Sequence, residues 1–247
     1  MRVGTHRTLA RHSGPDWPKL YVGLEGEAND PLLKKFYATR PVAGDTPLAE
    51  VPFAALDLET TGVNPETHGI VSVGLVPFTL ERIHCARSFY RLVRPRRPLA
   101  EESVTIHGIT HRELRRAPDL REILPELLHA LAGRVAVVHY RGIERPFLRR
   151  AVRERLGERL EFPVVDTMEI EARIYRGWKM HPAIRFMAAL VGRHPKSLRL
   201  AQSRARYHLP RYSAHHALTD ALASAELLQA QIAYRFGPET PVREIWH

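Results

Sequence analysis

Runs of apolar residues separated by turn-forming residues predict the strands of this chain. Some runs alternate apolar and polar positions and others are continuously apolar, the patterns of half-buried and fully buried strands. A short link at Leu80 and Glu81 predicts that the second and third runs pair as a hairpin. The five predicted strands cover residues 51–58, 70–78, 82–93, 134–139 and 162–165.

Apolar residues at helical spacing predict helices that follow these strands. Residues 119–132 place leucine and isoleucine on one stripe, and Gly133 ends the run. The other predicted helices cover residues 144–156, 167–191, 197–207 and 214–236. Strands and helices in this order predict an α/β fold in which helices cover both faces of a central sheet.

The first 48 residues have a different pattern, because aromatic residues are scattered there among charges and prolines. A polar cap before Pro31, followed by apolar positions at helical spacing, predicts a short helix. Residues 1–15 could instead form a disordered leader. The predicted divisions are an N-terminal accessory arm over residues 1–48, a main domain over residues 49–236 and a C-terminal tail over residues 237–247.

The chain of 247 residues carries 37 lysines and arginines against 27 aspartates and glutamates, a net charge of +10. This surplus favours a polyanionic partner, nucleic acid first. The alternative is a generally basic protein from a GC-rich organism, in which arginine is simply common.

No stretch approaches the roughly 18 apolar residues of a membrane span, and no apolar run follows the basic N-terminus as in a secretory signal. The single cysteine, Cys85, allows neither an internal disulfide nor a zinc cluster. We therefore expect a cytoplasmic protein without a membrane partner.

Two carboxylates end the first predicted strand. Residues two apart on a strand point to the same face, so Asp57 and Glu59 project together. Their charges repel, and a hard divalent cation with oxygen ligands would neutralise the pair. An edge strand with two solvated acids is the alternative.

Two further groups of titratable residues lie where later predicted helices begin. Glu144 lies where the fourth predicted strand gives way to a helix, and His215 and Asp220 lie at the start of the last helix. Residues five apart are offset by roughly 140° on a helix. We therefore expect His215 on the loop that leads into the helix and Asp220 in an early turn.

Five motifs in this order resemble the DEDDh 3′–5′ exonucleases, the family of the proofreading epsilon subunit of bacterial DNA polymerase III. The resemblance covers about residues 51–230 and implies a ribonuclease-H-like fold, with a central mixed five-stranded sheet flanked by helices and the hairpin antiparallel. The motifs are Leu56–Gly62, Val104–Thr110, Val165–Thr167, Ser197–Leu198 and His215–Ala221.

The resemblance also implies a chemistry. It implies two Mg²⁺ or Mn²⁺ ions, His215 as general base and release of nucleoside 5′-monophosphates from the 3′ ends of single-stranded DNA. The implied metal ligands are Asp57, Glu59, Glu144 and Asp220.

The chain departs from the family pattern at four positions, one of which is Val63 in place of a common leucine. Glu144 replaces the usual aspartate, and its extra methylene moves the carboxylate by about one bond, ~1.5 Å. The family acid often reaches its metal through water, so the longer side chain could still serve, and metal affinity or rate is the property that the change puts in question. Tyr140 and His216 stand where the family commonly has asparagine.

Contacts with nucleic acid are expected from backbone amides, arginines and one aromatic ring. Each has a structural alternative: a tight turn, loop packing, a solvated cation or a core tyrosine. The candidate residues are Thr60, Thr61, Gly62, His107, Thr110, Arg145 and Tyr207.

Two other functions remain compatible with the sequence. One is an RNA-trimming exonuclease that resembles ribonuclease T or oligoribonuclease, because both chemistries share these motifs. The other is a non-catalytic nucleic-acid-binding module, with Glu144 as the sign of a decayed site. Association with a polymerase is compatible too, although the tail contains no clear clamp-binding motif.

Overall fold

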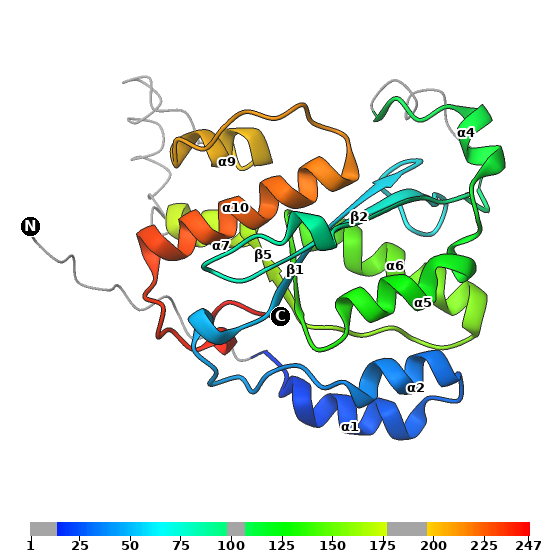
Figure 1. The fold of residues 1–247 in the computed structure, drawn as a ribbon, viewed down its shortest axis with the longest axis horizontal. Helices are drawn as coiled ribbons and strands as arrows, with labels where there is room; N and C mark the ends of the chain where they lie inside the picture. The colour runs from blue at the N-terminus through cyan, green and yellow to red at the C-terminus, as the bar shows by residue number, and fades with distance from the viewer. Residues whose placement is uncertain (1–13, 98–106, 177–196) are drawn as a thin grey trace, which may run out of the picture.

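The centre of the molecule is a mixed sheet of five strands in the order β3-β2-β1-β4-β5 (Figure 1). The computed structural model describes residues 14–97, 107–176 and 197–247. β1 runs antiparallel to β2 and parallel to β4, so the mixed sheet with an antiparallel hairpin is confirmed. The strands are β1 (Phe53–Thr60), β2 (Ile70–Phe78), β3 (Phe89–Leu92), β4 (Val135–Val138) and β5 (Val164–Asp166).

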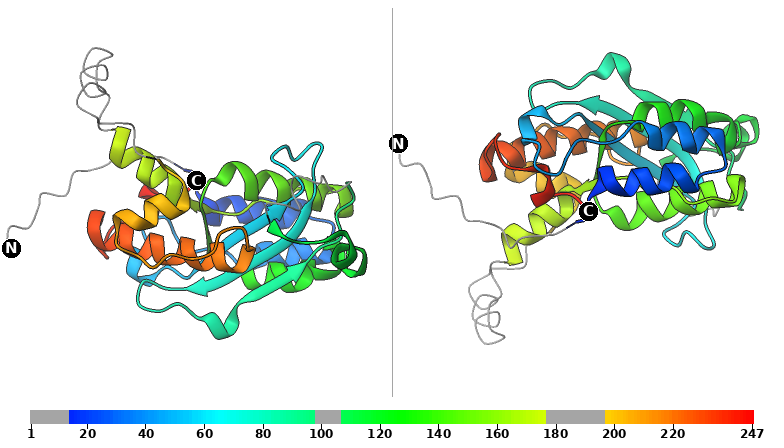
Figure 2. Two further views of the ribbon diagram at one scale, coloured as in Figure 1. Left: turned by 90° about the horizontal axis from the view of Figure 1, so that it is seen from above. Right: turned by 90° about the horizontal axis from the view of Figure 1, so that it is seen from below.

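Helices cover both faces of this sheet (Figures 1 and 2). α10 packs on β1 and β2, and α7 and α9 pack against α10; α5 and α6 lie on the opposite face. None of the helices in the described part of the chain has the length and apolar character of a membrane span. The helices of the main body are α4 (His111–Arg116), α5 (Leu120–Leu131), α6 (Arg141–Leu156), α7 (Thr167–Arg176), α9 (Leu200–Arg206) and α10 (Ala217–Arg235).

The apolar pattern explains why these elements pack as they do. Every residue of β2 is buried, as expected for a strand that has neighbours on both sides in a sheet covered on both faces. The stripe predicted on α5 is buried along its whole length, and Asp119 and Glu122 form a capping box at its start. These contacts fix the edge of the sheet at which β1 and β4 end.

The wrong predicted boundaries include those of the third strand and of the helix after the fourth strand. The third strand was predicted over residues 82–93, but β3 is much shorter, because the chain touches β2 at Ile83 and then leaves it in a short 3-10 turn, η2 (Cys85–Arg87). α6 begins earlier than predicted, since the chain turns into the helix directly after Tyr140. The part of the predicted helix beyond residue 176 lies outside the described residues.

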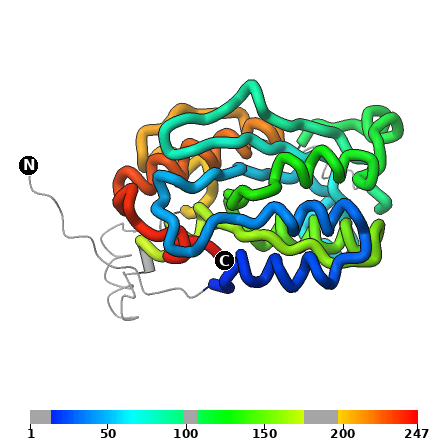
Figure 3. The backbone as a smooth tube through the Cα atoms, turned by 60° about the horizontal axis from the view of Figure 1, so that its bottom comes forward, coloured from blue at the N-terminus to red at the C-terminus, as the bar shows by residue number. Residues whose placement is uncertain are grey.

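The N-terminal arm forms two helices, α1 (Trp17–Glu27) and α2 (Pro31–Ala38), where one helix was predicted. Their buried aromatic rings contact one another. The backbone of α2 runs beside α5, on which it packs (Figure 3). The hydroxyl of Tyr37 donates to the carbonyl oxygen of Arg159 at 2.9 Å. The arm is thereby fastened to the outside of the helical layer.

The last residues also belong to the core. Residues 237–247 pass beside residues 44–50 and contain the short 3-10 helix η3 (Val242–Glu244), while η1 (Leu48–Glu50) lies opposite (Figure 3). His247 and Val164 exchange backbone hydrogen bonds of 2.8 and 3.2 Å, which extends the sheet beyond β5. The segment expected as a tail therefore packs into the fold.

Candidate active site

Three carboxylates converge at the end of β1. Asp57 and Glu59 project from the same side of this strand, and Asp220 reaches them from the first turn of α10. Each of the three offers an oxygen atom, and these atoms all lie within 4.8 Å of one another. Acids that are far apart in the sequence thus form one cluster, which we call the acidic cluster.

A glycine on β2 allows α10 to reach the cluster. Gly74 is paired with Asp57 in the sheet, and the start of α10 lies directly over it. A Cβ atom at Gly74 would lie 2.3 Å from the carbonyl carbon of Ala217 and 2.4 Å from the nitrogen of Leu218. Because both atoms belong to backbone, no side-chain movement could relieve such a contact. Sequence reasoning missed this position, since a glycine in a strand only suggests a close approach without naming the partner.

The replacement Gly74→Ala should therefore displace α10 and loosen the acidic cluster. We expect the free energy of unfolding to fall by about 1–3 kcal/mol, the usual cost of overpacking. Gly23→Ala is the matched control, because a Cβ at Gly23 in α1 has nothing within 4 Å. Chemical denaturation measures both variants, and Mn²⁺ titration should show weaker binding only for Gly74→Ala. Equal stability of the two variants would contradict the close contact.

Glu144 joins the cluster from α6. Its side chain is buried, and Oε2 has no hydrogen-bond partner within the described structure. Burial raises the pKa of Asp57, and the nearby charges of Glu144, Asp220 and Glu59 raise it further. The fourth acid of the sequence motif is therefore near enough to Asp57 for its charge to raise the pKa of that residue, although it arrives on a longer side chain.

The other acids of the cluster also hold their protons more tightly than usual. Burial and the charge of Asp220 raise the pKa of Glu59 to about 7, and burial raises the pKa of Glu144 to about 8. Crowded carboxylates with an unpartnered buried oxygen lack a counter-charge. Hard oxygen donors of this kind fit Mg²⁺ or Mn²⁺.

These raised pKa values predict how stability depends on pH without metal. A glutamate in the unfolded chain has a pKa of about 4.3, so the folded form binds protons more tightly between about pH 4.5 and 8. The stability that this binding contributes is complete below the unfolded value and is lost as pH rises through about 7 for Glu59 and 8 for Glu144.

The chelated protein should therefore melt at a lower temperature near pH 8 than near pH 6. Millimolar Mg²⁺ or Mn²⁺ should remove or reverse this fall, because the cation binds the ionised carboxylates. Thermal melts across this range, with and without the cation, test the expectation. A melting temperature that rises with pH in chelator would contradict the repulsion among the acids.

His215 lies on the loop before α10. Its imidazole is exposed, its φ is 67°, and its backbone N–H donates to Oδ2 of Asp220 at 2.7 Å. The next residue, His216, stacks on Tyr90 of β3 with ring centres 4.7 Å apart. The backbone beside His215 is thus tied to an acid of the cluster, while its own ring is left open to solvent.

An ion pair that the sequence did not reveal anchors the same loop. Arg204 is buried and donates to the carbonyl oxygen of Pro210 at 2.9 Å and to Glu226 at 2.6 Å. Tyr212 donates its hydroxyl to Glu226, and the guanidinium lies 4.6 Å from the centre of its ring. These contacts hold the first half of the loop that carries His215.

The turn after β1 is closed by its own hydrogen bonds. The hydroxyl of Thr60 donates to the carbonyl oxygen of Gly62 at 2.7 Å, and Thr61 exchanges hydrogen bonds with Gly69. A Cβ at Gly62 would lie 2.4 Å from the ring of His68. The turn continues directly from the strand that carries Asp57 and Glu59, so the structure places these predicted contacts beside the acidic cluster.

His107 and Thr110 lie on the approach to α4. Nδ1 of His107 accepts the N–H of Ile109 at 3.1 Å. Burial lowers the pKa of His107, and the nearby charge of His215 lowers it further. The two histidines therefore lie close enough for their charges to interact. Thr110 forms a capping box with Glu113 and is exposed.

The structure does not bring Arg145 to the acidic cluster, which corrects its assignment as a phosphate contact. Its guanidinium donates to the carbonyl oxygens of Phe162 at 2.7 Å and of His247 at 2.6 Å. It also lies 5.5 Å from the ring centre of Trp17, and burial lowers its pKa to about 10. The side chain therefore fastens the arm and the last residues to α6.

Tyr207 does not offer the stacking surface expected of it. Its side chain is buried, and its hydroxyl donates to Glu171 at 2.6 Å. Burial and this hydrogen bond raise the pKa of the phenol. Tyr207 therefore packs in the core, which was the structural alternative to a nucleic-acid contact.

Comparison with known proteins identifies the family of this chain. The sequence matches the exonuclease family named for RNase T over residues 54–228. The chain belongs to this exonuclease family. The resemblance to DEDDh exonucleases predicted from the motifs is thereby confirmed.

Relatives in this comparison include subunits and forms of DNA polymerase III and an epsilon-like protein. The epsilon subunit of Treponema pallidum is 28% identical over 184 residues, which cover 74% of this chain and 78% of that protein. An epsilon-like protein of Rhodobacter capsulatus is 31% identical over 185 residues, and the PolC-type polymerase of Thermotoga maritima is 27% identical over 161 residues. The matched regions cover 74% and 64% of this chain but only 24% and 12% of those two proteins.

Solved structures of exonucleases share the fold. The nuclease domain of 3′hExo, a DEDDh family member bound to rAMP, has a TM-score of 0.59 at 16% identity and covers 76% of this chain and 94% of that one. Exonuclease I of E. coli with a dT13 oligonucleotide has a TM-score of 0.56 at 14% identity, with 75% and 42% covered. The predicted ribonuclease-H-like fold is confirmed.

Proposed function

We propose that this chain is a divalent-metal-dependent 3′–5′ exonuclease that releases nucleoside 5′-monophosphates from single-stranded DNA. The observation that carries the proposal is the acidic cluster, in which oxygens of Asp57, Glu59 and Asp220 lie within 4.8 Å of one another. Glu144 faces the cluster from α6, and His215 lies beside it on a loop.

The four acids would hold two Mg²⁺ or Mn²⁺ ions. When bound, these ions supply an activated water and stabilise negative charge on the attacking and leaving oxygens. Asp57, Glu59 and Asp220 offer oxygens directly, and the unpartnered Oε2 of Glu144 would supply a further ligand or hold a water ligand. The crowding of four carboxylates is what makes cation binding favourable here.

His215 has the position of a general base. A water oxygen would attack phosphorus while His215 takes the proton of that water, and the bond from phosphorus to the 3′ oxygen of the preceding nucleotide breaks. The freed 3′ oxygen takes a proton from solvent and becomes the new chain end. The hydrogen bond from the His215 backbone to Asp220 keeps the base close to the acids while its ring stays free to meet the water.

The choice of single-stranded DNA rests on the relatives. The epsilon subunit of Treponema pallidum and PolC-type polymerases are among the relatives, and E. coli exonuclease I, which shares the fold, was solved with a dT13 oligonucleotide. A net charge of +10 supports a nucleic-acid substrate of either kind. RNA is the second candidate, because a 3′-exonuclease that recognises a histone mRNA stem-loop also shares the fold.

A panel of labelled oligonucleotides tests the proposal. We expect Mg²⁺- or Mn²⁺-dependent shortening of single-stranded DNA from its 3′ end, with nucleoside 5′-monophosphates as products. RNA of the same sequence, run beside it, decides between the two substrates. A 3′-phosphorylated DNA strand tests polarity. Absence of cleavage for all of these with metal present would overturn the proposal.

A polymerase is the partner that the relatives suggest. The epsilon subunit of Treponema pallidum matches this chain over most of both proteins. Co-purification of the chain with the polymerase subunit of its own organism tests that association. An intact polymerase complex that lacks this chain would contradict it.

A further inference from the structure

The residue before α6 has an unusual backbone for its size. Tyr140 has a φ of 99° and a ψ of 78°, in the left-handed region. A bulky L-residue is an outlier there, whereas glycine and asparagine enter the region more easily. Strain of this kind persists only where the surroundings impose it, and it gathers at functional sites.

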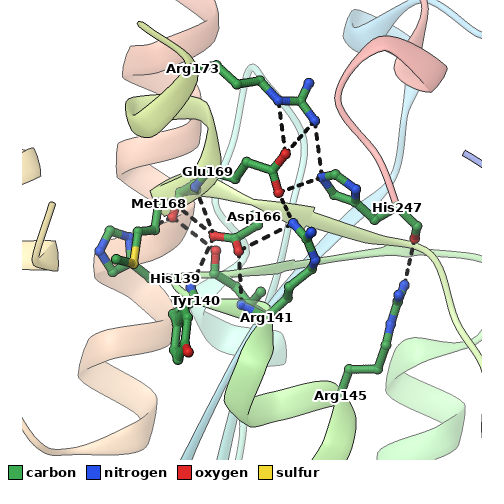
Figure 4. A network of polar contacts seen from close by, with 11 residues as sticks. His139, Tyr140, Arg141, Arg145, Asp166, Met168, Glu169, Arg173 and His247 are labelled. Atoms are coloured by element: carbon green, nitrogen blue, oxygen red, sulfur yellow. Dashed lines mark hydrogen bonds and ion pairs between the residues drawn. The ribbon is translucent and has the colours of Figure 1, made fainter. Parts of the chain in front are cut away.

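Asp166 imposes this conformation. Its two carboxylate oxygens accept the backbone N–H groups of Tyr140 at 3.1 Å and of Arg141 at 3.0 Å (Figure 4). The same carboxylate accepts the N–H groups of Met168 and Glu169, so it caps α6 and α7 together. The corner between β4 and α6 is thus fixed by contacts that do not involve the tyrosine ring.

Within the described part of the molecule, the ring makes no polar contact that would offset this strain. Tyr140 is 52% exposed, and its hydroxyl has no hydrogen-bond partner in the described part of the molecule. Figure 4 shows the side chain pointing away from the polar network around Asp166. The ring lies along Gly142, where a Cβ atom would meet its Cζ at 2.8 Å. One face of the ring is covered by bare backbone, and much of the remainder is open to solvent.

The exposed ring lies at the edge of the sheet where the acidic cluster is found. β1 and β4 are parallel neighbours, with Ala55 level with Val137. Two residues further along, β1 reaches Asp57, and β4 gives way to the residue that precedes Tyr140. Glu144 follows Tyr140 by about one helical turn.

We propose that Tyr140 contacts the substrate, by stacking its ring on a base of the single-stranded 3′ end next to the acidic cluster. This inference rests on the function proposed above and adds a residue that distinguishes the chain from the asparagine usual at this position. Stacking on an aromatic ring tolerates every base, so it provides affinity without sequence preference. The ring explains why a side chain poorly suited to the backbone stands where asparagine would be easier.

The replacement Tyr140→Asn separates strain from binding. Asparagine suits the left-handed backbone, so the variant should melt at the same or a higher temperature than the parent. Removal of the stacking surface should weaken binding of a single-stranded oligonucleotide by about 10-fold. Fluorescence anisotropy of labelled DNA in an Asp57→Asn background measures this affinity without cleavage. Tyr234→Asn is the matched control, because that tyrosine is 69% exposed but lies near the far end of α10.

Two additional measurements keep the test decisive. Tyr140→Phe retains the ring and should bind more tightly than Tyr140→Asn. On an oligonucleotide with abasic sites at its 3′ end, the difference between the parent and Tyr140→Asn should disappear. Equal affinity of parent and Tyr140→Asn for normal DNA, or an undiminished difference on abasic DNA, would overturn stacking by Tyr140. Failure of the parent with Asp57 intact to cleave any oligonucleotide would instead overturn the proposed function, so the two failures are distinct.

Discussion

Replacement of Asp57 by asparagine is expected to reduce cleavage of a single-stranded oligonucleotide by about 10²–10³-fold or more, the effect of losing one electrostatic stabiliser. The amide has the same shape as the carboxylate but no charge with which to hold a cation. Asp57 lies in the middle of the acidic cluster, where Glu144, Asp220 and Glu59 all raise its pKa in addition to burial. Initial rates with saturating Mg²⁺ measure the loss.

The same replacement should act in the opposite direction on stability. Without metal, the charge of Asp57 is repelled by its neighbours, so Asp57→Asn should melt at a higher temperature than the parent in chelator near pH 8. Asp16→Asn makes the same chemical change at the cap of α1 and should alter neither activity nor melting, because asparagine caps helices as well as aspartate does. Full activity of Asp57→Asn would overturn the assignment of the acidic cluster as the metal site.

Replacement of His215 by asparagine is expected to lower kcat by about 10²–10⁴-fold, the usual contribution of a general base. KM should change far less, because the acids that would bind metal remain in place. Asparagine tolerates the positive φ of this position and keeps the backbone N–H that donates to Asp220. The fall in kcat would therefore reflect loss of the imidazole.

His208 provides a close control for this experiment. It lies on the same loop between α9 and α10, is exposed, and also has a positive φ, of 56°. His208→Asn makes the same change in a similar backbone away from Asp220 and should retain the parental kcat. Equal losses of kcat in the two variants would assign the effect to the loop as a whole. A change confined to KM for His215→Asn would likewise contradict the role of His215 as general base.

Much of the fold was predictable because it depends on local pattern. The apolar runs of β1, β2 and β4 and the buried stripe of α5 appear where the sequence predicted them. β3 was overestimated because η2 interrupts a run that has a strand-like composition throughout. Composition reports what a segment favours, whereas the length of β3 is set by how far the chain stays beside β2.

The errors at the site have a different origin. Arg145 occupies a helix face that looks solvent-exposed in the sequence, but the arm and the last residues cover it. Gly74 looks like a weak point in a strand, although α10 requires it. The partners in these contacts lie far away in the chain, and no local pattern names them. The acids were found because their residue types carry the chemistry wherever the chain places them.

The distribution of the acidic cluster along the chain has a consequence during protein synthesis. Asp57 and Glu59 leave the ribosome well before Asp220, which belongs to the last long helix of the described residues. Because domains form from the N-terminus as they emerge, a nascent or prematurely terminated chain would lack the final ligand. The acidic cluster, and the activity proposed for it, would therefore be assembled only after α10 has been synthesised.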